Sequence, residues 1–176
     1  MFALGIGSGD EVICPSITFW ASIVQSYMLR ATPVFADIDP ETLNIDPKDI
    51  EKKITPHTKA IVVVHYAGVP ADMDSIMAIA KKHNLKVLED CSHAHGCTYN
   101  GQLVGTFGDA GAFSLMSGKA FAIGEAGILI TNDRAIYEKA ILWGHYIRHG
   151  DLAFEGIKEY AGLPCGGAKN RSHHLS

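Results

Sequence analysis

The sequence has few of the features that direct a protein to a membrane, to nucleic acid or to an oxidising compartment. Charged residues make up 19% of its 176 residues and the net charge is −4. No basic stripe with interleaved aromatics is present, which argues against a nucleic-acid partner. No apolar run reaches the ~18–20 residues of a membrane span, and the N-terminus lacks the pattern of a signal peptide. The four cysteines are scattered, as in reducing compartments. We therefore expect a cytoplasmic protein that contacts neither membrane nor nucleic acid.

What remains is an ordinary globular composition. Apolar residues make up 47% of the chain, which is enough for one domain with a hydrophobic core. Both ends are abrupt: residues 2–7 resemble the end of a helix followed by a glycine turn, and residues 171–176 form no complete element. We therefore expect a piece of a longer protein.

Apolar, β-branched runs alternate with amphipathic segments along the chain. The expected strands cover residues 12–14, 33–37, 60–65, 86–90, 110–115 and 127–131. The expected helices cover residues 17–30, 46–54, 72–84 and 132–149, with Asp46 and Asp72 as N-caps and Asn84 as a left-handed stop. A near-continuous apolar run such as 60–65 suits a parallel strand buried on both faces. The alternation predicts an α/β layered fold with a mainly parallel sheet.

Polar side chains gather where the expected strands end. Open parallel sheets bind ligands beyond the carboxyl ends of their strands. Asp90 ends one strand, Ser114 lies near the end of the next, Lys119 follows in the loop after it, and His65 ends a third. The chemistry is expected where these residues converge.

Asp90 and Lys119 carry the sharpest hypothesis. A carboxylate at the end of a buried strand needs a partner. A protonated pyridine nitrogen would suit, because the charge pair keeps the ring able to accept electrons. A lysine among small and apolar residues, such as Lys119, is nucleophilic toward an aldehyde when it is desolvated. The alternatives are a helix cap or structural ion pair for Asp90 and an exposed loop lysine for Lys119.

Neighbouring residues allow further interpretations. Ser114, Ser117 and Gly118 suit a phosphate, although ordinary turn chemistry explains them as well. Of Phe19 and Trp20, one could stack on a flat ring, whereas core packing is the more usual explanation for either aromatic.

The segment after Asp90 also allows the interpretation that it binds a metal. Cys91, His93, His95 and Cys97 are four potential ligands, but their strictly alternate spacing differs from that of a zinc knuckle. We expect no metal.

Several stretches together resemble the DegT/DnrJ/StrS family of sugar aminotransferases. They run in the family's order and include the acid and the lysine at the family's spacing. The matching stretches are residues 5–13, 31–39, 65–73, 89–96, 113–119, 124–127 and 166–171.

The resemblance implies a three-layer, fold-type-I pyridoxal-phosphate (PLP) transferase large domain, truncated at both ends. Residues 1–150 would form its central part, and residues 151–176 would begin the segment that leads to the absent C-terminal region. Lys119 would hold the cofactor and be catalytic, and Asp90 would pair with the pyridine nitrogen. His93, Phe19 and Ser114 would contact the ring or the phosphate. Lys169 would reach the phosphate of a partner subunit, which implies a homodimer.

The implied activity is transfer of an amino group from glutamate or glutamine to a keto sugar, such as a nucleotide sugar, or to a keto cyclitol. Three alternatives stay open: another fold-type-I PLP reaction, a non-catalytic remnant, and a metal-binding module. A PLP-dependent dehydratase of the same family is disfavoured, because such relatives have histidine in place of the lysine. Ala126, Asn170 and Ser172 depart from the family pattern.

Overall fold

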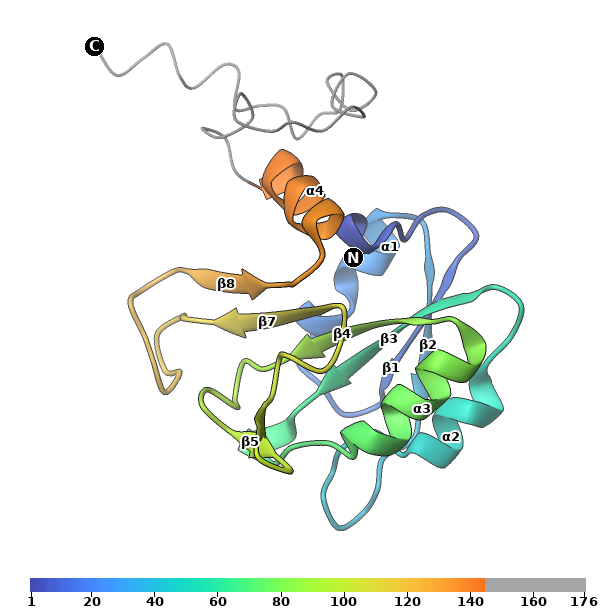
Figure 1. Ribbon diagram of the computed structural model, residues 1–176, viewed down its shortest axis with the longest axis horizontal. Coiled ribbons are helices and arrows are strands. Elements are labelled where there is room, and N and C mark those ends of the chain that lie inside the picture. Colours follow the sequence, from blue (N-terminus) through green and yellow to red (C-terminus); the bar gives the residue numbers. More distant parts are fainter. Residues whose placement is uncertain (145–176) are drawn as a thin grey trace.

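In a computed structural model of the chain, which describes residues 1–144, a six-stranded sheet lies between helices (Figure 1). The strand order is β2-β1-β3-β4-β7-β8. These strands are β1 (Glu11–Pro15), β2 (Thr32–Ala36), β3 (Thr58–Val64), β4 (Lys86–Asp90), β7 (Ala110–Ser114) and β8 (Gly127–Ile130). The α-helices are α1 (Val24–Met28), α2 (Pro47–Lys53), α3 (Met73–His83) and α4 (Arg134–Gly144). Short 3-10 helices are η1 (Phe2–Leu4), η2 (Trp20–Ser22) and η3 (Tyr66–Gly68).

The sheet is mainly parallel, as the sequence predicts. The β1–β2, β1–β3, β3–β4 and β4–β7 pairs are parallel, whereas β8 runs antiparallel to β7. The parallel registers place Val64 beside Asp90, and Asp90 beside Ala112. The carboxyl ends of β3, β4 and β7 therefore meet at one edge of the sheet, where the polar residues were expected to converge.

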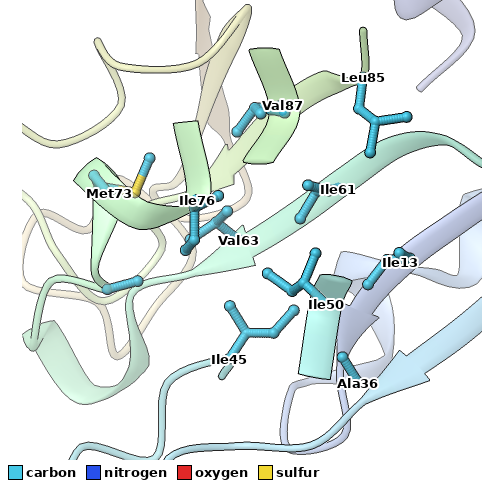
Figure 2. Packing of buried hydrophobic residues seen from close by; sticks show 12 residues of the cluster. Ile13, Ala36, Ile45, Ile50, Ile61, Val63, Met73, Ile76, Leu85 and Val87 are labelled. Carbon is cyan, nitrogen blue, oxygen red and sulfur yellow. The ribbon is translucent and has the colours of Figure 1, made fainter. Parts of the chain in front are cut away.

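One face of the sheet packs on α2 and α3. Figure 2 shows Ile61, Val63 and Val87 of the strands close to Ile50 of α2 and Ile76 of α3. Alternate residues of each strand point to opposite faces, so Val62, Val64 and Val12 face the other way, toward Ile23 and Ala31. This second cluster forms the other face of the core. Helices on both faces make three layers.

The structure confirms the two helices for which the sequence predicts a capping residue, α2 and α3. The Asp46 carboxylate accepts a hydrogen bond from the Lys48 backbone N–H, and Pro47 occupies the first turn of α2. Asp72 accepts from the Ser75 N–H at the start of α3, and Asn84 ends that helix with φ 54°. Each device satisfies backbone groups that a helix end leaves unpaired.

The expected single helix over residues 17–30 is wrong. The chain forms η2, breaks at Ile23 (φ −130°), and then makes the five-residue α1. Ile23 and Val24 are adjacent β-branched residues, which are poor helix formers. The Ser26 hydroxyl also donates to the Ile23 carbonyl, a local bond that competes with regular helix. The break leaves Ser22 at the end of η2, directed toward the sheet edge.

A small hairpin follows the carboxyl edge and was not expected. It pairs β5 (Thr98–Tyr99) with β6 (Gln102–Leu103). Its turn residues are Asn100 (φ 49°) and Gly101 (φ 81°). Asn-Gly is the strongest short signal for a two-residue hairpin turn, so the sequence did contain the cue.

A buried carboxylate holds the carboxyl edge together. Glu89 has no exposed surface, and its two oxygens accept four hydrogen bonds. Oε1 accepts from the N–H groups of Phe107 and Gly108 at 2.8 and 2.7 Å. Oε2 accepts from the Gly105 N–H at 2.7 Å and from His65 Nε2 at 3.1 Å. Glu89 thus ties β4 to the end of β3 and to the loop that precedes β7.

The His65 tautomer follows from its second contact. His65 Nδ1 accepts the Ala71 N–H at 3.1 Å, so the ring hydrogen lies on Nε2 and is donated to Glu89. Burial raises the pKa of Glu89, but the hydrogen bonds from His65, Gly108 and Gly105 outweigh this effect and hold the pKa below its ordinary value of 4.5. Glu89 therefore stays ionised near neutral pH.

Glycines let the loop before β7 approach the strands closely. A Cβ at Gly108 would lie 2.6 Å from the Val87 carbonyl oxygen, and one at Gly111 would lie 2.6 Å from Gly105 Cα. Real Cβ atoms do not come this close to backbone, so larger residues would push the loop away from Glu89.

Within residues 1–144, no helix has the length and apolarity needed to cross a bilayer. The expected boundary at residue 150, and the segment 151–176 after it, lie outside the described residues and stay predictions.

We expect Gly111→Ala to lower the free energy of unfolding by about 1–3 kcal/mol, because the new methyl group overlaps the Gly105 backbone. Urea unfolding followed by circular dichroism measures this. Gly7→Ala is the matched control, since a Cβ there has no atom within 4 Å. Equal stability of the two variants would contradict the close approach.

We expect Glu89→Gln to lower the free energy of unfolding at pH 7 by about 1.5–3 kcal/mol, because an amide NH₂ would face N–H donors. The folded-state pKa of Glu89 is lowered. The ionised carboxylate therefore makes its full contribution to the free energy of unfolding above pH 4.5, and this contribution is lost as the pH falls through the folded-state pKa. The difference between variant and wild type should therefore shrink in acid. Urea titrations at several pH values test this, with the exposed Glu41→Gln as control. A pH-independent difference would refute the assignment.

Candidate functional site

Asp90 ends β4 on the face opposite to Glu89. Glu89 follows Val87 on the α2 and α3 face, whereas Asp90 follows Leu88 on the face of η2 and α1. Asp90 is half-buried, and its backbone carbonyl accepts the His65 N–H at 3.1 Å. Strand alternation thus separates two adjacent acids into different surroundings.

The two acids differ in how many of their acceptor sites the protein uses. A carboxylate has about four lone-pair sites, and four donors occupy those of Glu89. Within residues 1–144 the Asp90 side chain accepts two hydrogen bonds: from the Ser22 hydroxyl to Oδ2 at 2.7 Å, and from the Ser92 N–H to Oδ1 at 3.0 Å. Asp90 therefore keeps acceptor capacity for a ligand, and Glu89 does not.

Lys119 lies in the hairpin loop between β7 and β8. A bridge pairs Met116 with Gly124, and the Lys119 N–H donates to the Met116 carbonyl at 3.1 Å. Gly118, with φ 93°, makes the turn that precedes the lysine. The Lys119 side chain is half-buried, and within residues 1–144 its amine has neither an ion pair nor a hydrogen bond. An unpaired, partly desolvated amine is suited to nucleophilic chemistry.

A pocket of about 330 Å³ joins this loop to the end of β4. Its lining includes Ala67, Ser92, His93, Ser117, Gly118 and Lys119. The structure thus brings two predicted site residues, Lys119 and His93, to one cavity. Asp90 does not line it but precedes Ser92, which does.

The other predicted site residues have distinct surroundings. The exposed His93 ring meets Tyr66 edge-on, with centroids 6.5 Å apart. Ser114 is half-buried at the end of β7, and its Oγ accepts the Met116 N–H at 3.3 Å. That bond leaves the Ser114 hydroxyl hydrogen available to a ligand. Lys169 lies outside the described residues.

Core packing does not explain the aromatic pair of η2. Phe19 and Trp20 are 64% and 63% exposed, and their ring centroids lie 5.2 Å apart. The alternative that one or both belong to the core is therefore wrong. Because Ser22 is bonded to Asp90, this segment lies against the acid, and Phe19 stays the predicted ring-stacking residue.

One group of three side chains comes close enough together to hold a metal ion, but its members have other partners. His65, Glu89 and Cys91 approach one another within 4.8 Å. However, both nitrogens of His65 and both oxygens of Glu89 are already hydrogen-bonded. Burial, together with nearby Glu89 and Asp90, raises the pKa of the Cys91 thiol, which disfavours the thiolate that a metal requires.

The two histidines of the alternating set have different neighbours, whereas Cys91 and Cys97 share one packed cluster. His93 meets Tyr66, whereas His95 lies between Phe113 and Phe121, with centroids 5.7 and 5.8 Å from them. Cys91 is buried near Gly105, and Cys97 lies near Gly68.

The donor set fits a phosphorylated pyridine aldehyde. Asp90 has acceptor capacity for a pyridinium N–H, and the Lys119 amine is unpaired beside a cavity. Ser114, Ser117 and the Gly118 turn supply hydroxyl and backbone groups of the kind that hold phosphate.

Sequence reasoning missed Ser22, Ser92 and Ala67. Ser22 and Asp90 are 68 residues apart, and no local pattern pairs them. Ala67 lines the pocket with a left-handed backbone, φ 51°, which is uncommon for a residue with a side chain. The stretch from His65 to Met73 resembles the family pattern, but the resemblance did not indicate which of its residues would face the cavity.

Two curated proteins show the similarity in sequence. GDP-perosamine synthase of Escherichia coli O157:H7 is 47% identical over 141 residues, which are 80% of this chain and 39% of that protein. L-glutamine:2-deoxy-scyllo-inosose aminotransferase of Micromonospora echinospora is 46% identical over 138 residues, which are 78% of this chain and 33% of that protein. The chain thus covers about a third to two fifths of the length of these relatives.

Solved structures show the same fold. The aminotransferase from Psychrobacter cryohalolentis has a TM-score of 0.79 at 50% identity, covering 81% of this chain and 36% of that one. NtdA from Bacillus subtilis, with bound cofactor PMP, has a TM-score of 0.76 at 37% identity, covering 81% of this chain and 32% of that one. The fold is therefore that of the fold-type-I PLP aminotransferases. A model of the DegT/DnrJ/EryC1/StrS aminotransferase family matches residues 1–163, and the chain belongs to that family.

Proposed function

We propose that the chain is part of a PLP-dependent aminotransferase that moves an amino group from glutamate or glutamine to a keto sugar or keto cyclitol. The observation that carries the proposal is that two groups lie at the same edge of the sheet: Asp90, an acid that keeps acceptor capacity, and Lys119, an amine without a partner within residues 1–144. Family membership and the named aminotransferases among its relatives support the reaction class.

Bound PLP would supply an electron-accepting ring that stabilises negative charge on the substrate carbon. Asp90 would hold the proton on the pyridine nitrogen. Lys119 would hold the aldehyde carbon until the amino group of the donor displaces it there, and the freed amine would then move protons at the substrate. Ser114 would donate to the phosphate, His93 would contact the cofactor from the pocket wall, and Phe19 would stack on the ring.

The substrates and assembly belong to the same proposal. Relatives are named for a GDP-sugar product and for a deoxy-inosose acceptor with glutamine as donor. We extend these classes to this chain: a nucleotide keto sugar or keto cyclitol as acceptor and an amino acid as donor. A cytoplasmic homodimer, with Lys169 of one protomer at the cofactor phosphate of its partner, completes the proposal and rests on the family resemblance.

We expect borohydride to fix PLP covalently to Lys119 in the purified enzyme, because reduction traps the bond between the amine and the aldehyde. Peptide mass spectrometry locates the label. Lys119→Ala should lose it, whereas Lys52→Ala should keep it, since Lys52 is 71% exposed and distant in the sequence from the pocket residues. Labelling of Lys119→Ala to the wild-type extent would refute the lysine assignment.

We expect Asp90→Asn to reduce kcat for amino transfer by at least about a hundredfold, because the neutral amide no longer stabilises a protonated ring. Steady-state kinetics with a keto-sugar acceptor measures the loss. Borohydride labelling of Lys119 should persist in this variant, which separates loss of electronic tuning from loss of the lysine bond. Wild-type kcat in Asp90→Asn would contradict the role of the acid.

A further inference from the structure

Two hydroxyls form a hydrogen-bonded chain that ends on Asp90. The Ser22 hydroxyl lies 2.7 Å from Asp90 Oδ2, and Thr18 Oγ1 lies 2.7 Å from Ser22 Oγ. Ser22 is only 8% exposed, although it lies in a three-residue 3-10 helix beside two exposed aromatics. A buried hydroxyl directed at the acid invites a functional explanation.

The direction of the chain follows from the chemistry of its members. An ionised carboxylate only accepts hydrogen bonds, so the single hydrogen of Ser22 goes to Asp90. Ser22 must then accept from Thr18, which donates. The order is therefore Thr18 to Ser22 to Asp90. Each bond in such a chain polarises and strengthens the next one.

The second oxygen of Asp90 is held from a different element. Ser92 N–H donates to Oδ1 at 3.0 Å, from the backbone that continues β4. One donor on each oxygen fixes the rotation of the carboxylate about its Cβ–Cγ bond. The lone pairs that remain then point in set directions, which a freely rotating carboxylate would not provide.

We propose that Ser22, oriented by Thr18, is a positioning residue that fixes the Asp90 carboxylate for the pyridine nitrogen of the cofactor. The inference rests on the proposed function, because it assigns Asp90 the cofactor as its ligand. The break in the expected helix places Ser22 at the end of η2, where its hydroxyl reaches the acid.

Ser26 offers a matched control in the same segment. Its hydroxyl is fully buried and donates to the Ile23 carbonyl at 2.8 Å, whereas the hydrogen bonds of the Asp90 carboxylate within residues 1–144 come from Ser22 and Ser92. Ser26→Ala therefore perturbs the packing of this segment without touching the acid. Ser22→Thr keeps a hydroxyl at the position that contacts Asp90, so it serves as the rescue variant.

The test uses the purified holoenzyme and three readouts: the PLP dissociation constant by equilibrium dialysis, the visible circular dichroism per bound cofactor, and the thermal midpoint of the cofactor-free protein. We expect Ser22→Ala to bind PLP about tenfold more weakly, since a hydrogen bond to a charged group is lost. The visible dichroism per bound cofactor should fall, because the cofactor ring would no longer be held in a single orientation. Ser22→Thr should restore both, and Ser26→Ala should change only the thermal midpoint.

Thr18→Val provides a second variant should Ser22→Ala fail to fold, because it removes the distal hydroxyl and keeps the shape of the half-buried side chain. It should shift affinity and dichroism in the same direction by a smaller factor. The positioning role would be overturned if Ser22→Ala had wild-type PLP affinity and dichroism. If Ser22→Ala does not fold, the same result in Thr18→Val would overturn it. So would equal losses in Ser26→Ala. Failure of the wild-type enzyme to bind PLP at Lys119 would instead overturn the proposed function itself.

Discussion

Everything at the carboxyl edge depends on one buried negative charge. Glu89 is removed from water, and a bare carboxylate there would be very unfavourable. Four N–H donors from two segments, His65 after β3 and the loop 105–108, compensate for the lost hydration. Neither segment can move away from Glu89 without leaving the buried charge short of donors. The end of β3, the loop that precedes β7 and strand β4 are thereby held in one arrangement.

The hydrogen bonds of Glu89 also fix the position of the next residue, Asp90. Because Glu89 is fixed on one face, Asp90 is fixed on the other, and its backbone is further tied to His65. The protein thus presents a saturated acid and an available acid one residue apart. A cofactor nitrogen would meet a carboxylate whose position is set by the core and whose orientation is set by Ser22 and Ser92.

Much of this could be predicted from the sequence, and the failures share a cause. The strands, the capped helices and the roles of Asp46, Asp72 and Asn84 depend on local patterns, and the structure confirms them. The helix break at Ile23 and the Ser22–Asp90 bond depend on contacts between distant segments, which periodicity does not record. Glu89 stood beside Asp90 in the sequence, yet nothing local distinguished the acid that the protein saturates from the one that it leaves available. The β5–β6 hairpin differs from these cases, because the Asn100-Gly101 pair at its turn is a local signal that the sequence contains.

The reversed direction of β8 has a further consequence for how this site can vary. A parallel successor to β7 would need a crossover that leaves the carboxyl edge, but an antiparallel one lets the chain turn back at once. Lys119 is therefore carried on a hairpin whose two stems are both anchored in the sheet. Residues at the tip can be exchanged without disturbing the strands. A single insertion in either stem, by contrast, would shift the pairing by one residue and exchange the faces to which its side chains point. Changes in length that leave the sheet intact are therefore confined to the part of the hairpin beyond the Met116–Gly124 bridge.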